Sequence, residues 1–347
     1  MSVLRVLGTA VATGEPVDLY ADGDRWTADP VRDAEAVPVG WVLPGLVDAH
    51  THPGYQEVGG PLDDKVLRDH LHQHVDSGVT LIRAPGLAGD PPDWFGTDPD
   101  VPRAVHAGPW IAQHGQFFDG WGRRASHAEL PGLAAEQAAR TGWAKLIADW
   151  KTDDEHLPAG VLRAVVERVH AVGGRVAVHS QQRSGGTAAV EAGVDSLEHG
   201  TWLDPDLLTR MAAQGTALTP TLSVLLGGVP VVTARPESEF RSWWLAGVAA
   251  HPATIAAAAE AGVTLLAGTD SLPHGRIAAE VRALAGAGVP AHQALGAASW
   301  TARAFLGLPG LEPGAPADAV VYAADPRTDL DQLDHPLAVI LRGRRVR

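Results

Sequence analysis

Two histidines follow an apolar run near the start of the chain, in the segment PGLVDAHTHPG at 44–54. His50 and His52 are two residues apart, so in an extended strand both side chains point to the same face. Two imidazoles on one face can bind a single metal ion. The alternative is that they are two polar residues opening a loop. The apolar run before them favours the metal interpretation, because it places both at the end of a strand.

Four further side chains suited to chemistry stand at or near the ends of later apolar segments. They are Lys145 in WAKLIA, His179 at the end of RVAVH, His199 at the end of VDSLEH, and Asp270 after VTLLAG. Each alone has an ordinary structural explanation: an edge lysine, a core imidazole or a helix cap. Because each follows its own apolar segment, we expect all four to meet His50 and His52 in one site.

The elements that must position these residues alternate along the chain. Eight apolar segments predict strands at 45–50, 78–84, 103–112, 143–148, 175–179, 194–199, 216–222 and 263–268. Helical patterns lie between or after several of them, at 162–172, 186–193, 204–215, 251–262 and 278–288. Eight strands alternating with helices predict an α/β fold of the (β/α)8 TIM-barrel type. In such barrels the chemistry lies at the carboxyl ends of the strands.

The two ends of the chain have a different pattern, with short β-rich pieces broken by Gly, Asp and Pro. We expect 1–45 and 306–347 to form one small β-sandwich domain, because neither piece alone makes a stable sheet. The barrel then occupies 46–305. Within it, the stretch 223–250 is longer than an ordinary connection, and we expect a lid or a substrate loop there.

Composition narrows the classes of function. The 347 residues carry a net charge of −14, which disfavours nucleic-acid binding, and no apolar run is long enough for a membrane helix. The chain has no cysteine but 16 histidines, so a transition-metal site must use imidazole and carboxylate. We expect a cytoplasmic protein whose partner is a small-molecule substrate, with no nucleic acid and no membrane; the sequence leaves a homo-oligomer open.

The motifs, taken in order, resemble the amidohydrolase superfamily, most closely its imidazolonepropionase and Xaa-Pro-dipeptidase-like branch. The resemblance covers nearly the whole chain. It rests on PGLVDAHTH, GVTLIR, AVEAGVDSLEHG, AGVTLLAGTDSLPHG and the closing HQALGAASWTARAFLGL with GLEPGAPADAVVY.

This resemblance implies a binuclear metal centre, with zinc as the expected ion, two divalent ions per chain, and other divalent metals open. His50, His52 and Asp270 match the ligands of the more buried ion, and His179 and His199 those of the second. Lys145 matches a lysine that is carbamylated and bridges both ions. A free ammonium has no lone pair and cannot be a ligand, whereas a carbamate offers anionic oxygens.

The resemblance also implies a metal-dependent hydrolase of an amide or related C–N bond, in a dipeptide, an N-acyl amino acid or a cyclic amide. A metal-activated water attacks, Asp270 shuttles its proton to the leaving nitrogen, and His199 lies beside the reacting carbonyl. Segments after the fourth and fifth strands depart from the family pattern and suggest three substrate-binding residues, Trp150, Gln181 and Arg183.

Three alternatives stay open. One is a mononuclear ring-opening hydrolase or deaminase, in which His199 is a catalytic neighbour of a single ion and Lys145 is unmodified. Another is a lactone, ester or organophosphate hydrolase on the same centre. The non-enzyme alternative is an inactive metal-binding homologue.

Overall fold

The computed structural model describes residues 3–152 and 155–347, and it has an α/β fold in which strands alternate with helices. Two parallel sheets form its centre, with strand orders β10-β9-β11-β12-β13-β14 and β6-β7-β8. Their strands are β6 (Leu46–Asp48), β7 (Val79–Ala84), β8 (Arg103–His106), β9 (Ile111–Gln113), β10 (Arg123–Ala125), β11 (Trp143–Ile147), β12 (Arg175–Ser180), β13 (Ser196–His199) and β14 (Ala217–Thr219). Strands are therefore present in seven of the eight predicted segments.

Two predicted strands differ from the structure. The segment 103–112 is divided into β8 and β9, because Gly108 has a φ of +68° and Pro109 cannot donate to a ladder. The segment 263–268 is no regular strand. Its backbone makes single bridges instead, with Leu265 opposite Leu218 and Asp270 opposite Thr51. These bridges link β14 to β6, and so connect the two sheets through the residues that precede and include Asp270.

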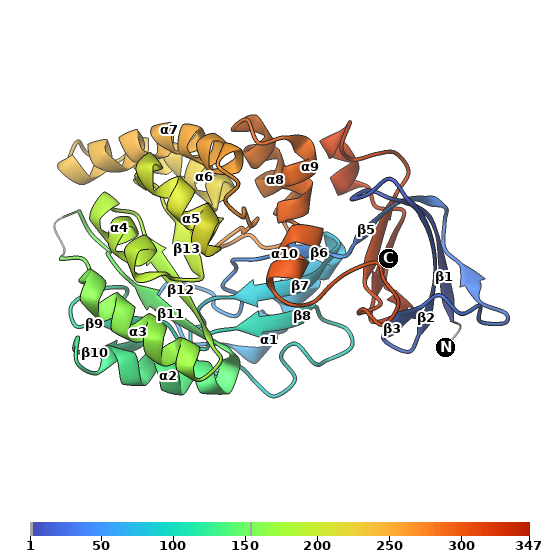
Figure 1. Cartoon of the computed structure of the whole chain (residues 1–347), viewed down its shortest axis with the longest axis horizontal. Coiled ribbons are helices and arrows are strands. Elements are labelled where there is room, and N and C mark those ends of the chain that lie inside the picture. Colours follow the sequence, from blue (N-terminus) through green and yellow to red (C-terminus); the bar gives the residue numbers. More distant parts are fainter. Residues whose placement is uncertain (1–2, 153–154) are drawn as a thin grey trace.

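Helices follow most strands and cover the outside of the sheets (Figure 1). They are α1 (Asp64–Asp76), α2 (Leu130–Thr141), α3 (Ala159–Ala171), α4 (Arg183–Ala192), α5 (Leu208–Gln214), α6 (Leu222–Thr233), α7 (Glu239–Glu260), α8 (Ile277–Gly286), α9 (Ala291–Ala297) and α10 (Trp300–Phe305), with short 3₁₀ turns at Pro205–Leu207 and Leu330–Asp334. Each of the five predicted helical patterns coincides with a helix. None of the helices among the described residues is long and apolar enough to cross a membrane.

The prediction of a loop over 223–250 is wrong, because this stretch is helical. It contains most of α6 and the first half of α7, which pack against each other. The apolar run in α6 continues the helix, and the Ser238 side chain caps α7 by accepting a hydrogen bond from the Arg241 N–H. Only the residues between the two helices form a connection, so no long flexible loop is present there.

Strands from both ends of the chain pair in one sheet, at the end of the molecule where both termini lie (Figure 1). Its strands are β1 (Leu4–Ala10), β2 (Pro16–Asp22), β3 (Arg25–Thr27), β4 (Glu35–Ala36), β5 (Gly40–Pro44), β15 (Ala319–Tyr322), β16 (Ala338–Leu341) and β17 (Arg344–Arg345). The central pairing joins β5 to β15, with Val320 opposite Leu43. This sheet has its own buried apolar cluster, which includes Val6, Trp26 and Ile340. All eight strands belong to one hydrogen-bonded sheet, so the two-sheet sandwich stays a prediction.

Candidate active site

One cavity brings together all six side chains that the sequence suggested as metal ligands. Its volume is about 220 Å³, and its lining includes His50, His52, Lys145, His179, His199 and Asp270. They come from the ends of β6, β12 and β13, from the middle of β11 and from the bridge segment beside β6. The carboxyl ends of parallel strands share one edge, which is why residues up to 220 positions apart meet here.

His50 and His52 direct two unprotonated nitrogens at the same point. The Nδ1–H of His50 donates to Glu198 Oε2 at 2.6 Å, and the Nδ1–H of His52 donates to the Gly86 carbonyl at 2.7 Å. Both acceptors lack a hydrogen, so the proton of each neutral ring is on Nδ1 and each Nε2 carries a lone pair. The two Nε2 atoms are nevertheless only 3.0 Å apart. Two lone pairs at that distance repel each other unless a cation lies between them.

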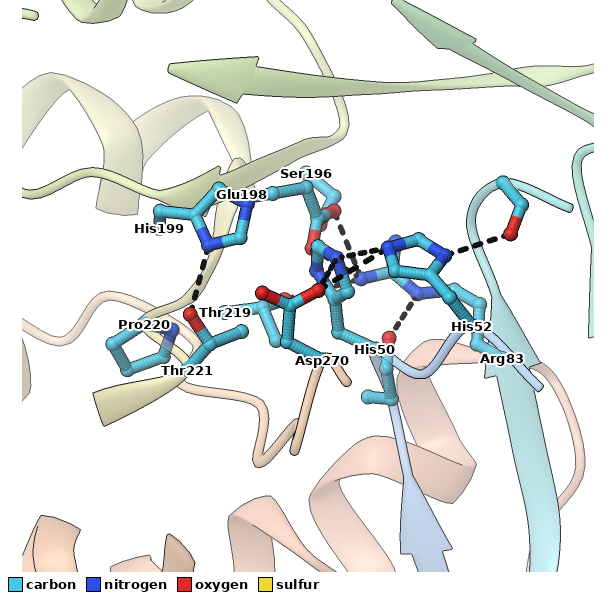
Figure 2. Close-up of polar contacts among 12 residues, drawn as sticks. His50, His52, Arg83, Ser196, Glu198, His199, Thr219, Pro220, Thr221 and Asp270 are labelled. Carbon is cyan, nitrogen blue, oxygen red and sulfur yellow. Dashed lines mark hydrogen bonds and ion pairs between the residues drawn. The ribbon is translucent and has the colours of Figure 1, made fainter. Parts of the chain in front are cut away.

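Asp270 adds an anionic oxygen at the same point (Figure 2). Its Oδ1 lies 3.4 Å from His52 Nε2 and 3.7 Å from His50 Nε2. The ligand atoms of these three residues all lie within 4.8 Å of one another, which is the arrangement needed to hold one metal ion. Burial raises the pKa of Asp270, while His50 and Lys145 lower it. A carboxylate that is drawn towards protonation in this way can both bind a cation and accept a proton.

His199 lies on the other side of Asp270 from His52 (Figure 2). Its ring centroid is 4.6 Å from that of His179. His199 is held through Nδ1, which is 2.8 Å from the Thr221 hydroxyl, and this leaves its Nε2 unused. Burial is the main cause that keeps the pKa of both imidazoles well below the ordinary value. Both rings are therefore neutral and able to act as ligands near pH 7.

Lys145 is buried in β11, and its ammonium nitrogen has no hydrogen-bond partner among the described residues. Burial lowers its pKa to about 8, with a smaller contribution from Arg83, against the opposing effects of Glu198 and Asp270. A buried cation without a partner is costly, whereas a neutral amine can react with carbon dioxide. The position therefore suits a lysine that is modified before it functions.

A buried ion pair between Arg83 and Glu198 lies next to His50 and orients its ring. Arg83 Nη2 lies 2.9 Å from Glu198 Oε1, and the Ser196 hydroxyl donates to the same oxygen at 2.6 Å. Burial alone would raise the pKa of Glu198, but Arg83, Lys145 and His50 hold it well below its ordinary value. Glu198 is therefore ionised, and its second oxygen fixes the tautomer and the orientation of His50.

The backbone is strained at two of the candidate ligands. His199 has a φ of +67° and Asp270 a φ of +63°, in the left-handed region that non-glycine residues rarely adopt. Such conformations cost on the order of 1–3 kcal/mol each and concentrate at functional sites. The glycine before the Thr269–Asp270 pair has a related role. A Cβ on Gly268 would lie 2.5 Å from His50 Cβ, so only glycine allows this close approach.

Of the three predicted substrate-binding residues, two line the cavity. Trp150 and Gln181 lie in its wall, and Asp149 Oδ1 accepts a 2.8 Å hydrogen bond from the Gln181 N–H. Arg183 is elsewhere. Its guanidinium is exposed and pairs with Asp204 at 2.5 Å, beside a different cavity. The first turn of α4 directs its side chain outwards, so the structure does not bring Arg183 to the other site residues.

The Arg83–Glu198 pair and the aromatic part of the cavity were not predicted from the sequence. A signal for the pair was present, because each charged residue stands inside an apolar strand segment, GVTLIRA or VDSLEH. Charged groups are seldom buried unless they are paired. The aromatic residues of FFDGW at 117–121 were a sequence signal for the lining, although nothing local indicates that these rings face the site.

Comparison with known families agrees with this geometry. The family model described as "Amidohydrolase family" matches residues 41–346. The chain belongs to the amidohydrolase family. It is therefore a hydrolase that acts on carbon–nitrogen bonds, as the motifs predicted. An uncharacterized protein of Mycobacterium tuberculosis is 38% identical over 360 residues, covering 98% of this chain and 95% of that protein.

Solved structures share the fold at low sequence identity. A Xaa-Pro dipeptidase with methionine bound in its active site superposes with a TM-score of 0.83 at 22% identity, covering 99% of both chains. The ochratoxinase of Aspergillus niger has a TM-score of 0.82 at 21% identity, covering 99% of this chain and 96% of that one. At these identities the likeness establishes the fold alone.

Proposed function

We propose that this protein is a metal-dependent hydrolase that cleaves an amide or related C–N bond. The observation that carries the proposal is the 3.0 Å separation of the His50 and His52 Nε2 atoms, both without a proton, beside the Asp270 carboxylate. A divalent cation between them converts a repulsive arrangement into a favourable one. The neutral imidazoles and the carboxylate are a donor set that suits zinc, and other divalent ions fit the same atoms.

The residues present also support a second ion. His179 and His199 would hold it, and Lys145 would bridge the two ions as a carbamate. The neutral amine of Lys145 adds to carbon dioxide, forming an N–C bond and releasing one proton. The resulting anionic oxygens would replace an amine nitrogen that has no hydrogen-bond partner among the described residues. When bound, divalent ions lower the pKa of a water molecule and polarise a carbonyl.

The chain's own residues then supply proton transfer and orientation. Asp270 accepts the proton of the attacking water and returns it to the leaving nitrogen, which its raised pKa favours. Glu198 and Arg83 keep the lone pair of His50 directed into the site. Gln181, held by Asp149, is placed to donate to the developing oxyanion, and His199 lies beside the reacting carbonyl. Trp150 and the neighbouring rings exclude water from one side of the cavity.

A mononuclear centre is the second candidate. It is favoured by one observation, that His50, His52 and Asp270 are the only group of three ligand residues found to converge within the described ranges. In that case Lys145 stays unmodified, and His199 acts on the substrate directly.

The architecture we propose for this activity is a closed (β/α)8 barrel over 46–305. The supporting observation is that the segment at 264–270 makes backbone hydrogen bonds to β14 on one side and to the end of β6 on the other. We assign 1–45 and 306–347 to one β-domain, because their sheet buries an apolar cluster drawn from these two segments alone. Other residues of the same sheet, such as Leu43 and Val320, join the core around the parallel strands.

Metal content and turnover together test the proposal. The purified chain, loaded with zinc, should hold two ions and hydrolyse at least one member of a panel of amides. Substituting His52→Ala should remove metal and turnover together. His170→Ala is the matched control, because His170 is exposed and pairs only with Asp195 among the described residues. A zinc-loaded chain that hydrolyses no amide, or a His52→Ala variant that keeps both metal and turnover, contradicts the proposal.

A further inference from the structure

Six aromatic side chains form one wall of the cavity, which we call the aromatic wall. They are Tyr55, Trp110, Phe117, Phe118, Trp121 and Trp150. The wall reaches the candidate metal ligands at two places: Trp110 lies 4.9 Å from the His52 ring and Trp150 lies 5.3 Å from the His179 ring, between centroids. Any substrate whose carbonyl reaches the ligands must therefore lie along these rings.

The rings of the wall hold one another in place. Trp110 and Trp121 are stacked, with centroids 4.9 Å apart and an interplanar angle of 16°. Trp150 meets the edges or faces of Phe117 and Phe118 at 4.9 and 4.6 Å. The Trp121 indole N–H also donates to the Gly60 carbonyl at 2.6 Å. The wall is a preorganised surface, and rings held in this way bind another ring with little loss of side-chain entropy.

Positive charge is scarce where a substrate would bind. Lys145 is the only cationic side chain among the described residues that line the cavity, and it lies among the metal ligands. Arg124 approaches the wall from behind, with its guanidinium 6.0 Å from the Phe117 centroid. Its terminal nitrogens donate to the carbonyls of Trp121 and Phe118, both at 2.7 Å. A carboxylate placed beside the rings would therefore lose its hydration without gaining a counter-ion.

The cavity is also small. A dry apolar cavity of about 150 Å³ is large enough to bind benzene. The volume here, about 220 Å³, suits one aromatic ring together with a small polar group such as an amide.

We propose that the cavity selects small, uncharged amides that carry one aromatic ring, and that this ring packs on the aromatic wall. The assignment of an amide rests on the proposed function, whereas the preference for an uncharged aromatic ring rests on the wall itself. It narrows the substrate class and disfavours dipeptides and N-acyl amino acids, whose carboxylate would find no cationic side chain beside the rings.

Binding and turnover of matched pairs separate the two parts of the proposal. The first pair is N-methylbenzamide with N-methylcyclohexanecarboxamide, and the second is acetanilide with N-cyclohexylacetamide. A third pair, N-benzoylglycinamide with N-benzoylglycine, differs only in charge. Dissociation constants come from calorimetry on the metal-free and the zinc-loaded chain, and kcat/KM from the zinc-loaded chain. In at least one of the first two pairs the aromatic member should bind about tenfold more tightly than its partner. In the third pair the neutral amide should bind more tightly than the acid.

Substitutions in the aromatic wall test whether these rings cause the preference for aromatic ligands. Trp150→Leu and Phe118→Leu should each reduce the aromatic preference to about threefold or less. Trp94→Leu is the control, because Trp94 packs under Arg68 and does not line this cavity. It should leave the preference unchanged. Thermal unfolding of each variant shows whether it is folded. Two wall variants are made so that one remains for the test if the other does not fold.

Each outcome decides one part of the question. Aromatic preference in binding without any turnover supports the inference and overturns the hydrolase. Turnover without aromatic preference supports the hydrolase and overturns the inference. Tighter binding of N-benzoylglycine than of its amide overturns the inference, as does a preference that survives both wall substitutions.

Discussion

Two clusters of buried histidines adjoin the segment 50–52. Only one of the two has its ligand atoms arranged to hold a metal ion. The first is the site described above. The second consists of His70, His74 and His274, and the last two lie beside Thr51, the residue between His50 and His52. The Thr51 hydroxyl lies 3.3 Å from His74 Nε2 and 3.1 Å from His274 Nδ1. The His70 and His274 rings are 4.4 Å apart between centroids.

Burial is common to both clusters, so burial does not distinguish them. It lowers the pKa of His74 to about 3 and that of His274 to about 2, and it likewise lowers the pKa values of His50 and His52 in the first cluster. The difference lies in the atoms that face each other. In the second cluster a hydroxyl bridges two imidazoles, and the nearby Asp48 is engaged by Thr269, whose hydroxyl donates to it at 2.5 Å. In the first, three proton-free ligand atoms converge.

The comparison indicates what a histidine cluster needs in order to hold a metal ion. Desolvation keeps imidazoles neutral, which is necessary for ligation but equally compatible with a structural role. Fixed tautomers that direct several lone pairs at one point are the additional requirement. Four substitutions test this contrast, in order of decreasing expected effect.

Asp270→Asn should have the largest effect. The amide is a weaker ligand and a poor base, so we expect turnover to fall by about 10²–10⁴-fold while the fold is kept. Steady-state kinetics and circular dichroism of the zinc-loaded variant check this. Near-normal turnover at full metal content would show that Asp270 is not the proton shuttle.

Lys145→Ala should lose the second ion and most of the activity. The proposed carbamate bridge could not form in this variant, and two cations in the site would then repel each other without compensation. Metal content by plasma mass spectrometry should fall from two ions per chain to one. A short carboxylic acid with bicarbonate should restore part of the activity, and Lys145→Glu should partly mimic the bridge. A variant that retains both ions and its activity would show that Lys145 is an ordinary barrel residue. A parent chain that holds one ion, unaffected by the substitution, would instead favour the mononuclear centre.

Glu198→Gln should weaken zinc binding by about 10–100-fold, the usual effect of removing a carboxylate behind a metal-bound histidine. The amide no longer dictates that the proton of His50 is on Nδ1, and Arg83 loses its counter-ion. Competition with a chelator measures the affinity. Ser196→Ala, which removes only a hydroxyl donor to Glu198, is the milder comparison. Equal zinc affinity in the Glu198 variant and the parent chain would refute the positioning role.

His274→Phe should leave metal content unchanged and alter only the response to acid. The folded-state pKa of His274 lies far below the value of about 6.5 in the unfolded chain, so the unfolded chain binds more protons below pH 6.5. Stability is therefore lost as the pH falls below that value, at up to about 1.4 kcal/mol per pH unit for each such imidazole. Denaturant unfolding between pH 7 and pH 5 should show a shallower loss in the variant. Loss of zinc from His274→Phe would mean that the two clusters are not independent.

Much of the site could be predicted from the sequence, because its ligands follow local rules. Side chains alternate along a strand, so the spacing of His50 and His52 places both on one face. Apolar segments that end in polar residues identify strand ends, and these ends share one edge of a parallel sheet. His179, His199, Asp270 and Lys145 were selected in this way, and the resemblance to the family added the bridging role expected of Lys145. These signals need no knowledge of which strands are neighbours.

Other features of the site depend on contacts between distant segments, and only the tertiary structure reveals them. Glu198 supports His50 across 148 residues, and Arg83 pairs with it across 115. The aromatic wall combines rings from several loops, whose directions depend on the packing of their neighbours. Arg183 is directed away from the site for the same reason, since a helix turn, and not its place near a histidine, orients its side chain. Periodicity records which face a residue occupies within its own element, but it contains no information on what that face meets.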